Sequence, residues 1–330
     1  MTGADRIEVG LVLYPGAQLA AVLGMTDFLL LAGRIAAEAT DHRQAPALRV
    51  SHWQLHEGEA APRRVFDTAP DEAGALSVLI LPPRLGPLIE PAEAAPFVGW
   101  LRESHGTGTV LCSICTGAFL LGETGLLAGR SITTHWTFEE AFEARFSEAK
   151  MDAARLIIDD GDIITAGGVM AWTDLVLKLI DRYLGPVVML EVARRFLVDP
   201  PGREQSYYSA FAPRLNHGDG AILKVQHWLQ ATGAKEADLA ALAARAGLEE
   251  RTFLRRFQKA TGLTTTEYAQ RIRVSRAREL LQSGACTADQ VAWDVGYSDP
   301  GAFRKVFAKI VGLTPAEYRK RFQARSPHLP

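Results

Sequence analysis

The sequence has few cysteines and no long apolar run, and each scarcity excludes a class of protein. Three cysteines in 330 residues, Cys112, Cys115 and Cys286, are too few for the disulfide framework of a small secreted protein. The single CxxC has no second Cys or His pair nearby, so we expect no metal site. The sequence contains no run of about 18 apolar residues, so we predict no membrane span. The N-terminus lacks the pattern of a signal peptide. We therefore expect a cytoplasmic protein without a bound cofactor.

Charge is distributed unevenly along the chain. The formal net charge is −2, yet residues 1–220 hold 18 Lys and Arg against 28 Asp and Glu, a balance of −10. Residues 221–330 hold 18 Lys and Arg against 10 Asp and Glu, a balance of +8. A basic C-terminal part on an acidic body favours a polyanionic partner for that part. A solvated basic surface without a partner is the alternative that charge alone leaves open.

The first half alternates short apolar runs with helical patterns. Residues 6–14, 75–82 and 108–114 are typical of buried strands, and residues 155–168 predict two short strands around a turn at 159–161. Helices are expected at residues 19–37, 118–127, 138–145, 170–183 and 186–198. Strands separated by helices predict a three-layer α/β domain with a mostly parallel sheet. We assign it to residues 1–198.

Residues 199–220 contain Pro, Gly and polar residues without an apolar period, which indicates a linker. From residue 221 onward the pattern is helical and duplicated: residues 247–271 align with residues 296–321, with one extra residue in the second copy's turn. Phe253 then matches Phe303, and Phe257 matches Phe307. Residues 221–330 are therefore expected to form an all-α domain with two copies of one helical unit.

Each copy contains a short helix, a turn with glycine and a second helix. The second helices are predicted at residues 250–260 and 300–311, where two phenylalanines four residues apart face the core. The opposite side of each helix carries basic residues, which are Arg251, Arg255 and Lys259 in the first and Arg304, Lys305 and Lys309 in the second. A helix of this kind fits the major groove of DNA, where Arg and Lys pair with guanine edges and phosphates.

Residues 221–325 resemble the DNA-binding domain of AraC/XylS-type transcriptional regulators. The matching segments are residues 239–268, residues 291–322 and the linking helix that contains RVSRARELL. The resemblance implies that two recognition helices enter successive major-groove segments on one face of double-stranded DNA. It also implies base-facing positions, which are Arg251, Leu254, Arg255, Gly301, Arg304 and Lys305. Leu254 offers only an apolar contact, so the first helix is not purely a hydrogen-bonding reader.

Cys115 follows a predicted buried strand and precedes a helix that begins with small residues. A nucleophile at such a turn is exposed near a helix N-terminus, which favours the thiolate and a lowered pKa. Twenty residues later, His135 is a candidate partner. The alternative is a structural cysteine under a tight turn and a histidine satisfied by packing, and the spacing alone slightly favours it.

Residues 6–198 resemble the PfpI-like branch of the class I glutamine-amidotransferase-like superfamily. The matching segments are SICTGAFLL, GLLAGRSITTHW and DDGDIITAGGV. The resemblance implies Cys115 as the nucleophile and His135 as its partner, with an acidic residue early in the chain. Ala21 occupies that acidic position, and Pro83-Arg84 replaces a Gly-Gly whose backbone N–H binds an oxyanion. Proline has no N–H to donate, so we expect a vestigial site or ligand pocket instead of an active enzyme.

These observations predict a sequence-specific transcriptional regulator that binds a DNA operator as a homodimer. The first domain is expected to sense a small-molecule effector or to dimerise, through residues 170–183 and 186–198. The alternative is a bifunctional protein in which a thiol-dependent, amidase- or glyoxalase-like enzyme is fused to a DNA-binding domain. The residues at positions 21 and 83 favour the first hypothesis.

Overall fold

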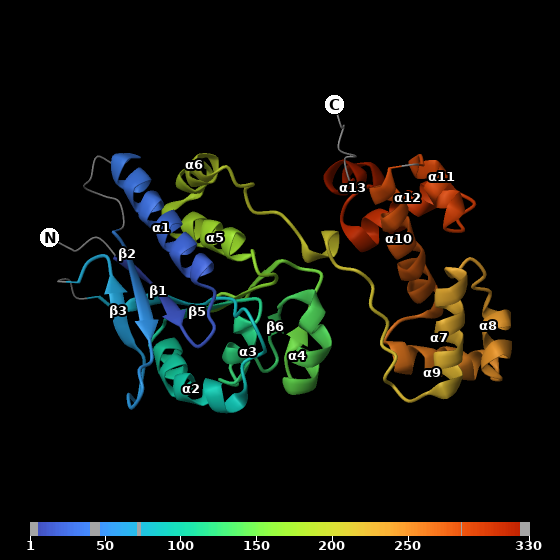
Figure 1. Cartoon of the computed structure of the whole chain (residues 1–330), viewed down its shortest axis with the longest axis horizontal. Coiled ribbons are helices and arrows are strands. Elements are labelled where there is room, and N and C mark those ends of the chain that lie inside the picture. Colours follow the sequence, from blue (N-terminus) through green and yellow to red (C-terminus); the bar gives the residue numbers. More distant parts are fainter. Residues whose placement is uncertain (1–5, 40–46, 71–73, 285, 324–330) are drawn as a thin grey trace. The chain divides into compact units, whose positions relative to one another are not determined.

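The computed structural model describes residues 6–39, 47–70, 74–284 and 286–323. The chain forms two compact units, of which unit 1 ends at Gln205 and unit 2 begins at Ser206 (Figure 1). This boundary lies inside the segment 199–220 that the sequence marks as a linker. Both ends of that segment are packed on their own unit, because Gln205 is buried in unit 1 and Asp219 caps the first helix of unit 2.

Unit 1 is built on a seven-stranded sheet with the order β3-β2-β1-β4-β5-β9-β8. The inner five strands run parallel, and the edge strands β3 and β8 are antiparallel to their neighbours. The strands are β1 (Ile7–Leu13), β2 (Leu48–Gln54), β3 (Arg63–Asp67), β4 (Leu76–Leu81), β5 (Val110–Ile114), β8 (Ile157–Asp159) and β9 (Ile163–Ala166), with β6 (Ser131–Ile132) and β7 (Lys150–Met151) in a small second sheet. The mostly parallel sheet confirms the predicted fold class.

Helices cover both faces of this sheet, which gives three layers (Figure 1). One face is covered by α1 (Leu19–Ala39), α5 (Trp172–Leu184) and α6 (Pro186–Phe196), and the other by α2 (Pro91–Gly106), α3 (Gly117–Gly122) and α4 (Glu139–Arg145). Each face has its own apolar core. Strands β1, β4 and β5 consist mostly of apolar residues, as expected for parallel strands that are covered on both faces.

Helix α1 is the one described helix that is long and apolar enough to cross a membrane, with a mean hydropathy of 1.7 over its most apolar window. Half of that window is buried inside unit 1, where the helix packs against the sheet and α5. Asp27 and Arg34 lie within the helix. These contacts identify α1 as a core helix of the α/β domain.

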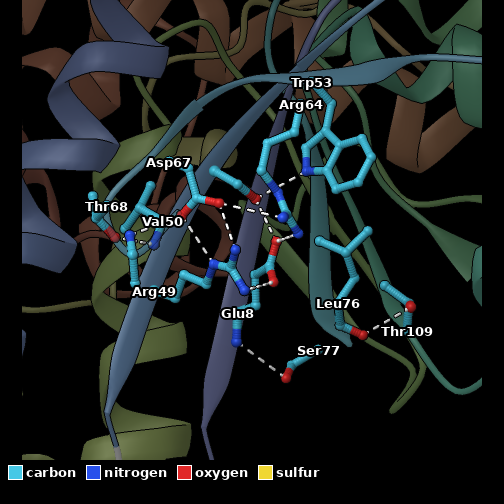
Figure 2. Close-up of polar contacts among 12 residues, drawn as sticks. Glu8, Arg49, Val50, Trp53, Arg64, Asp67, Thr68, Leu76, Ser77 and Thr109 are labelled. Atoms are coloured by element: carbon cyan, nitrogen blue, oxygen red, sulfur yellow. Dashed lines mark hydrogen bonds and ion pairs between the residues drawn. The ribbon is translucent and has the colours of Figure 1, made fainter. Parts of the chain in front are cut away.

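A buried ionic network joins the first three strands at one side of the sheet (Figure 2). The fully buried Arg49 guanidinium donates to both carboxylate oxygens of Asp67 and lies 3.3 Å from Glu8. Glu8 also accepts hydrogen bonds of 2.7 Å from the Ser51 hydroxyl and from Arg64. Two cations therefore neutralise two carboxylates, with Arg49 and Glu8 fully buried and Arg64 partly exposed, and this arrangement ties the edge strand β3 to β2 and β1.

All the regular secondary structure of unit 2 is helical in the residues that the structure describes. They are α7 (Gly220–Thr232), α8 (Leu239–Ala246), α9 (Glu250–Thr261), α10 (Thr265–Ser283), α11 (Ala288–Asp294), α12 (Pro300–Val311) and α13 (Pro315–Phe322), preceded by the 3₁₀ turn Gln205–Tyr207. Two apolar cores lie along α10, one around Phe253 and Phe257 and the other around Phe303 and Phe307. The two phenylalanine pairs that align in sequence thus occupy equivalent places in two similar subdomains.

The duplicated helix ends repeat the same capping chemistry. Thr264 and Thr314 both cap a helix through a reciprocal capping box with the glutamate three residues later. Gly262 and Gly312 end the recognition helices in the left-handed region, at φ 75° and 84°. The duplication therefore extends to the glycine that ends α9 and α12 and to the capping box that starts the helix after each of them.

Candidate DNA-reading helices and cysteine elbow

Helix α9 presents one apolar and one basic face. Phe253 and Phe257 are buried in the first core of unit 2, whereas Arg251, Leu254 and Arg255 are exposed. In the described part of the chain, no carboxylate contacts Arg251 or Arg255. Their guanidinium groups are therefore available to a ligand of unit 2.

Helix α12 repeats this arrangement with two differences. Arg304 and Lys305 are exposed opposite the buried phenylalanines, but Arg304 pairs with the Asp289 carboxylate of α11. The Gly301 N–H donates to Asp299, the residue that caps α12. Asp289 was not predicted from the sequence, and it holds Arg304 in one orientation.

A shallow groove of about 710 Å³ lies between α8 and the start of α9. Arg251 and Leu254 line it together with small side chains of α8, and so do Glu249 and Glu250. The two glutamates were also missed by the sequence prediction. A carboxylate repels phosphate but accepts a hydrogen bond from a cytosine amino group, so the start of α9 is suited to base edges more than to backbone.

Cys115 lies in a strained elbow between β5 and α3. Its φ of +52° falls in the left-handed region, which costs energy for a residue with a side chain. Helix α3 begins so close to β4 that a Cβ on Gly117 would lie 2.4 Å from the Leu81 carbonyl oxygen. This close approach explains the small residues that follow the cysteine.

The expectation of a lowered thiol pKa at Cys115 is wrong. Burial raises the pKa of Cys115 to about 11, although backbone N–H groups of Thr116, Gly168 and His135 hydrogen-bond the thiol and act in the opposite direction. The side chain is only 1% exposed. Desolvation outweighs the helix N-terminus here because the charged form has lost contact with water.

The His135 side chain is directed to its own turn. Its Nδ1 accepts from the Thr137 N–H at 3.2 Å and lies 2.7 Å from the Thr137 hydroxyl. The ring stacks on Trp136 at a centroid distance of 5.5 Å, and partial burial lowers the pKa of His135. The structure therefore brings the His135 backbone to Cys115, while the imidazole caps the 3₁₀ turn that follows.

The backbone donors around position 83 are already used within the protein. Pro83 has no N–H, the Arg84 N–H donates to the Thr116 hydroxyl at 2.7 Å, and the Leu85 N–H donates to Gly16 at 3.1 Å. Ala21 is fully buried and supplies no carboxylate. The Leu85 N–H is therefore also not free to bind an oxyanion in place of the donor lost at position 83.

Gln205 fills the space beside the elbow from the end of unit 1. Its amide nitrogen donates to the Thr133 hydroxyl and to the carbonyls of Thr134 and Arg155, and its amide oxygen accepts from the Trp136 N–H. A Cβ on Gly167 would collide with this side chain. This contact could not be predicted from the sequence, because Gln205 is 50 to 72 residues from its partners and lies in a polar segment.

The described surface of unit 1 has a cleft of about 690 Å³ that Cys115 does not line. Its lining combines cations, anions and apolar side chains: Asp152, Arg155, Leu156, Ile157, Ile158, Asp159, Asp174, Lys178, Pro201, Gly202, Arg203 and Glu204. Arg155 is 58% exposed and pairs with Glu204 at 3.3 Å. The described residues contain no group of three or more His, Cys, Asp or Glu side chains able to hold a metal ion.

Comparison with known proteins matches both units. A helix-turn-helix domain model matches residues 242–321, and a DJ-1/PfpI family model matches residues 85–182. The HTH-type transcriptional regulator GlxA of Rhizobium meliloti is 30% identical over 67% of this chain and 68% of its own length. The regulator CdhR of Pseudomonas aeruginosa is 27% identical over 72% of this chain and 71% of its own length.

An isonitrile hydratase of Pseudomonas putida is 26% identical over 54% of this chain and 73% of its own length. That likeness is shorter and more distant than those to the regulators. A DJ-1/PfpI domain followed by a helix-turn-helix domain is the organisation found here in units 1 and 2. The chain therefore belongs to the AraC-type helix-turn-helix transcriptional regulators that carry a DJ-1/PfpI domain.

Proposed function

We propose that α9 and α12 read two successive major-groove segments of an operator in double-stranded DNA. The observation that carries this proposal is the duplicated helix whose phenylalanine pair is buried and whose basic side is exposed. Arg251, Leu254 and Arg255 are the base-facing residues of α9. In α12, Arg304 and Lys305 fill this role, while the backbone of Gly301 allows close approach. Such a protein acts in the cytoplasm, where bacterial DNA lies.

Unit 1 acts in this proposal without catalysis. The likeness to isonitrile hydratase favours the alternative of a thiol enzyme fused to a DNA-binding unit. Three features argue against that alternative: the protonated and buried Cys115, the turn-capping His135 ring and the occupied donors after Pro83. A missing oxyanion donor alone typically lowers turnover about 100- to 1,000-fold.

We assign the effector of this regulator to the cleft at Arg155, because Cys115 in the elbow is buried and not accessible to a ligand. The cleft offers guanidinium and ammonium groups next to carboxylates and an apolar wall. A small molecule that carries both a carboxylate and an ammonium group would match it. The pair between Arg155 and Glu204 is partly exposed to water, so it contributes little to stability and can exchange for ligand contacts.

Two variants, Cys115→Ser and Arg155→Ala, test the two proposals for unit 1 separately. The first tests catalysis at Cys115, and the second tests effector binding at Arg155. Neither variant is expected to change operator affinity, and neither wild type nor Cys115→Ser should hydrate or hydrolyse small substrates above background. In a thermal-shift screen with the free amino acids, at least one compound should raise the Tm of wild type and Cys115→Ser but not of Arg155→Ala. Turnover that depends on Cys115 would establish the bifunctional enzyme instead, and equal shifts in all three proteins would move the effector site away from Arg155.

Unit 1 also forms the homodimer in this proposal, through α6. Helix α5 buries seven side chains against the sheet and α1, whereas α6 leaves Val187 and Leu190 exposed, and Leu197, which directly follows α6, is exposed as well. Exposed apolar side chains that share a helix face are typical of a protein interface. Of the two helices that the sequence suggested, α6 therefore has the surface for a partner.

Replacing both Val187 and Leu190 by glutamate is expected to convert the full chain from a dimer to a monomer in analytical ultracentrifugation. Burying two carboxylates in an apolar interface costs far more than leaving them in water. Val65→Glu is the control, because Val65 is similarly exposed on the edge strand β3. If the double variant sediments like the wild type, α6 is not the interface.

A further inference from the structure

Unit 2 begins with an irregular segment, residues 206–217, that we call the arm. Apart from the last two residues of the 3₁₀ turn Gln205–Tyr207, it has no regular secondary structure. The sequence presents it as part of a linker, yet aromatic and polar side chains of the arm pack on both subdomains of unit 2. The two subdomains otherwise share α10. Its Tyr268 and Ile272 belong to the first core, and its Val274, Ala277 and Leu281 belong to the second.

The start of the arm packs on the second subdomain. The Tyr208 ring meets Phe322 of α13 edge to face at 5.3 Å, and its hydroxyl accepts from Arg321 at 3.1 Å. The Tyr207 ring lies against Gly312, where a Cβ would be 2.7 Å from it. These contacts fix the arm to the end of recognition helix α12, because Gly312 is the residue that terminates that helix.

The later part of the arm packs on the first subdomain. Phe211 meets Tyr268 edge to face at 5.1 Å and borders the first core. The Arg214 carbonyl accepts from the buried Gln226 amide at 2.9 Å, and Gln226 also donates to the Tyr268 hydroxyl at 3.1 Å. The arm thus contacts the cores behind both recognition helices.

Arg278 of α10 holds the first residues of the arm. Its side chain is 9% exposed, and its guanidinium donates to the backbone carbonyls of Ser206 and Ser209. The guanidinium also lies over the Tyr318 ring of the second core, 5.5 Å from the centroid. A buried guanidinium needs partners for its hydrogens, so the arm and Arg278 depend on one another.

We propose that the arm is a clamp that fixes the spacing between recognition helices α9 and α12, with Arg278 as its positioning residue. The proposal rests on the proposed reading of two DNA subsites by these helices. Two recognition helices on separate subdomains read two subsites together only when their separation matches one turn of DNA. A second connection beside α10 keeps that separation constant, and without it each subdomain would still read its own subsite.

Operators with altered spacing test the clamp in the full-length protein. Wild type should bind the selected operator tightly and lose at least tenfold in affinity when 2 bp are inserted between the subsites. In Arg278→Ala, affinity for the selected operator should fall about tenfold, whereas the 2-bp insertion should cost less than threefold. Affinity for a probe with one subsite scrambled should be the same in both proteins.

Arg276→Ala is the matched control, since Arg276 is on the same helix, is 61% exposed and pairs with the exposed Glu279. Tyr208→Ala releases the arm without removing a buried charge and should reproduce the Arg278→Ala pattern, which guards against a variant that simply unfolds. If Arg278→Ala and Tyr208→Ala keep the wild-type preference for operator spacing, the clamp is refuted, but the proposed reading of DNA by α9 and α12 is not. Absence of a two-subsite operator for wild type would instead refute the proposed mode of reading.

Discussion

Arg49→Met should lower the free energy of unfolding of unit 1 by about 3–5 kcal/mol. The guanidinium of Arg49 is fully buried between the carboxylates of Glu8 and Asp67. Methionine fills most of the volume but leaves two buried negative charges with only Arg64 to compensate them. The loss is large because removing one partner from a buried ionic network strands the others away from water (Figure 2).

Urea denaturation followed by tryptophan fluorescence measures this loss in the full chain, since unit 1 contains four of the six tryptophans. Arg63→Met is the control on the neighbouring strand, where Arg63 is 61% exposed and pairs with Glu59. Its effect should stay within about 1 kcal/mol. Equal losses in the two variants would mean that the buried network contributes no more than a surface ion pair.

The network also predicts the direction of a pH effect. Hydrogen bonds from Arg49 hold the pKa of Asp67 below its ordinary value of 3.8. A carboxyl whose pKa is lower in the folded state contributes stability above its unfolded pKa and loses it as the pH falls through the folded value. Wild type should therefore lose stability below about pH 4 more steeply than Arg49→Met, which lacks the largest cause of this shift.

Arg255→Ala should reduce affinity for the preferred operator by about 1–3 kcal/mol, roughly 5- to 150-fold. The exposed guanidinium lies in the middle of α9, where a recognition helix meets base edges. A bidentate contact to guanine would be lost together with its discrimination against other bases. Fluorescence anisotropy with operators that vary at each position should show relaxed preference at one base pair.

Lys259→Ala provides the comparison, because Lys259 is exposed one turn further along the same helix. A lysine near the end of the helix is expected to contact phosphate, so its loss should weaken binding equally for all sequences. The slope of log affinity against log salt concentration should also become shallower by about 1. If Arg255→Ala also weakens all sequences equally, Arg255 is a phosphate contact and the assignment of α9 side chains needs revision.

The helical unit 2 was largely predictable, because its signals are local and repeated. Phenylalanines four residues apart mark the buried face, and glycine ends both recognition helices in a backbone conformation that other residues avoid. The contacts of residues 206–217 were not predictable. They connect side chains about 50 to 110 residues apart, as with Tyr208 and Phe322, and no periodicity records such pairs.

In unit 1 the apolar central strands were predicted, whereas β2 and β3 were missed. The reason is visible in β2, where Arg49, Ser51 and His52 are buried polar residues that hide the apolar pattern of a strand. The elbow at Cys115 was found from its neighbours in sequence, but the thiol pKa was assigned the wrong direction. Its burial depends on segments that meet only in the fold, including the backbone at Gly168 and His135.

Selection of bound fragments from random double-stranded DNA by the full-length protein tests the central claim most directly. Two helices that each enter a major groove on one face of DNA predict an enriched site with two sequence blocks centred about 10 bp apart. The block read by α9 should lose one preferred base when the selection is repeated with Arg255→Ala. Enrichment of a single block, or of no sequence above the starting library, would contradict the account.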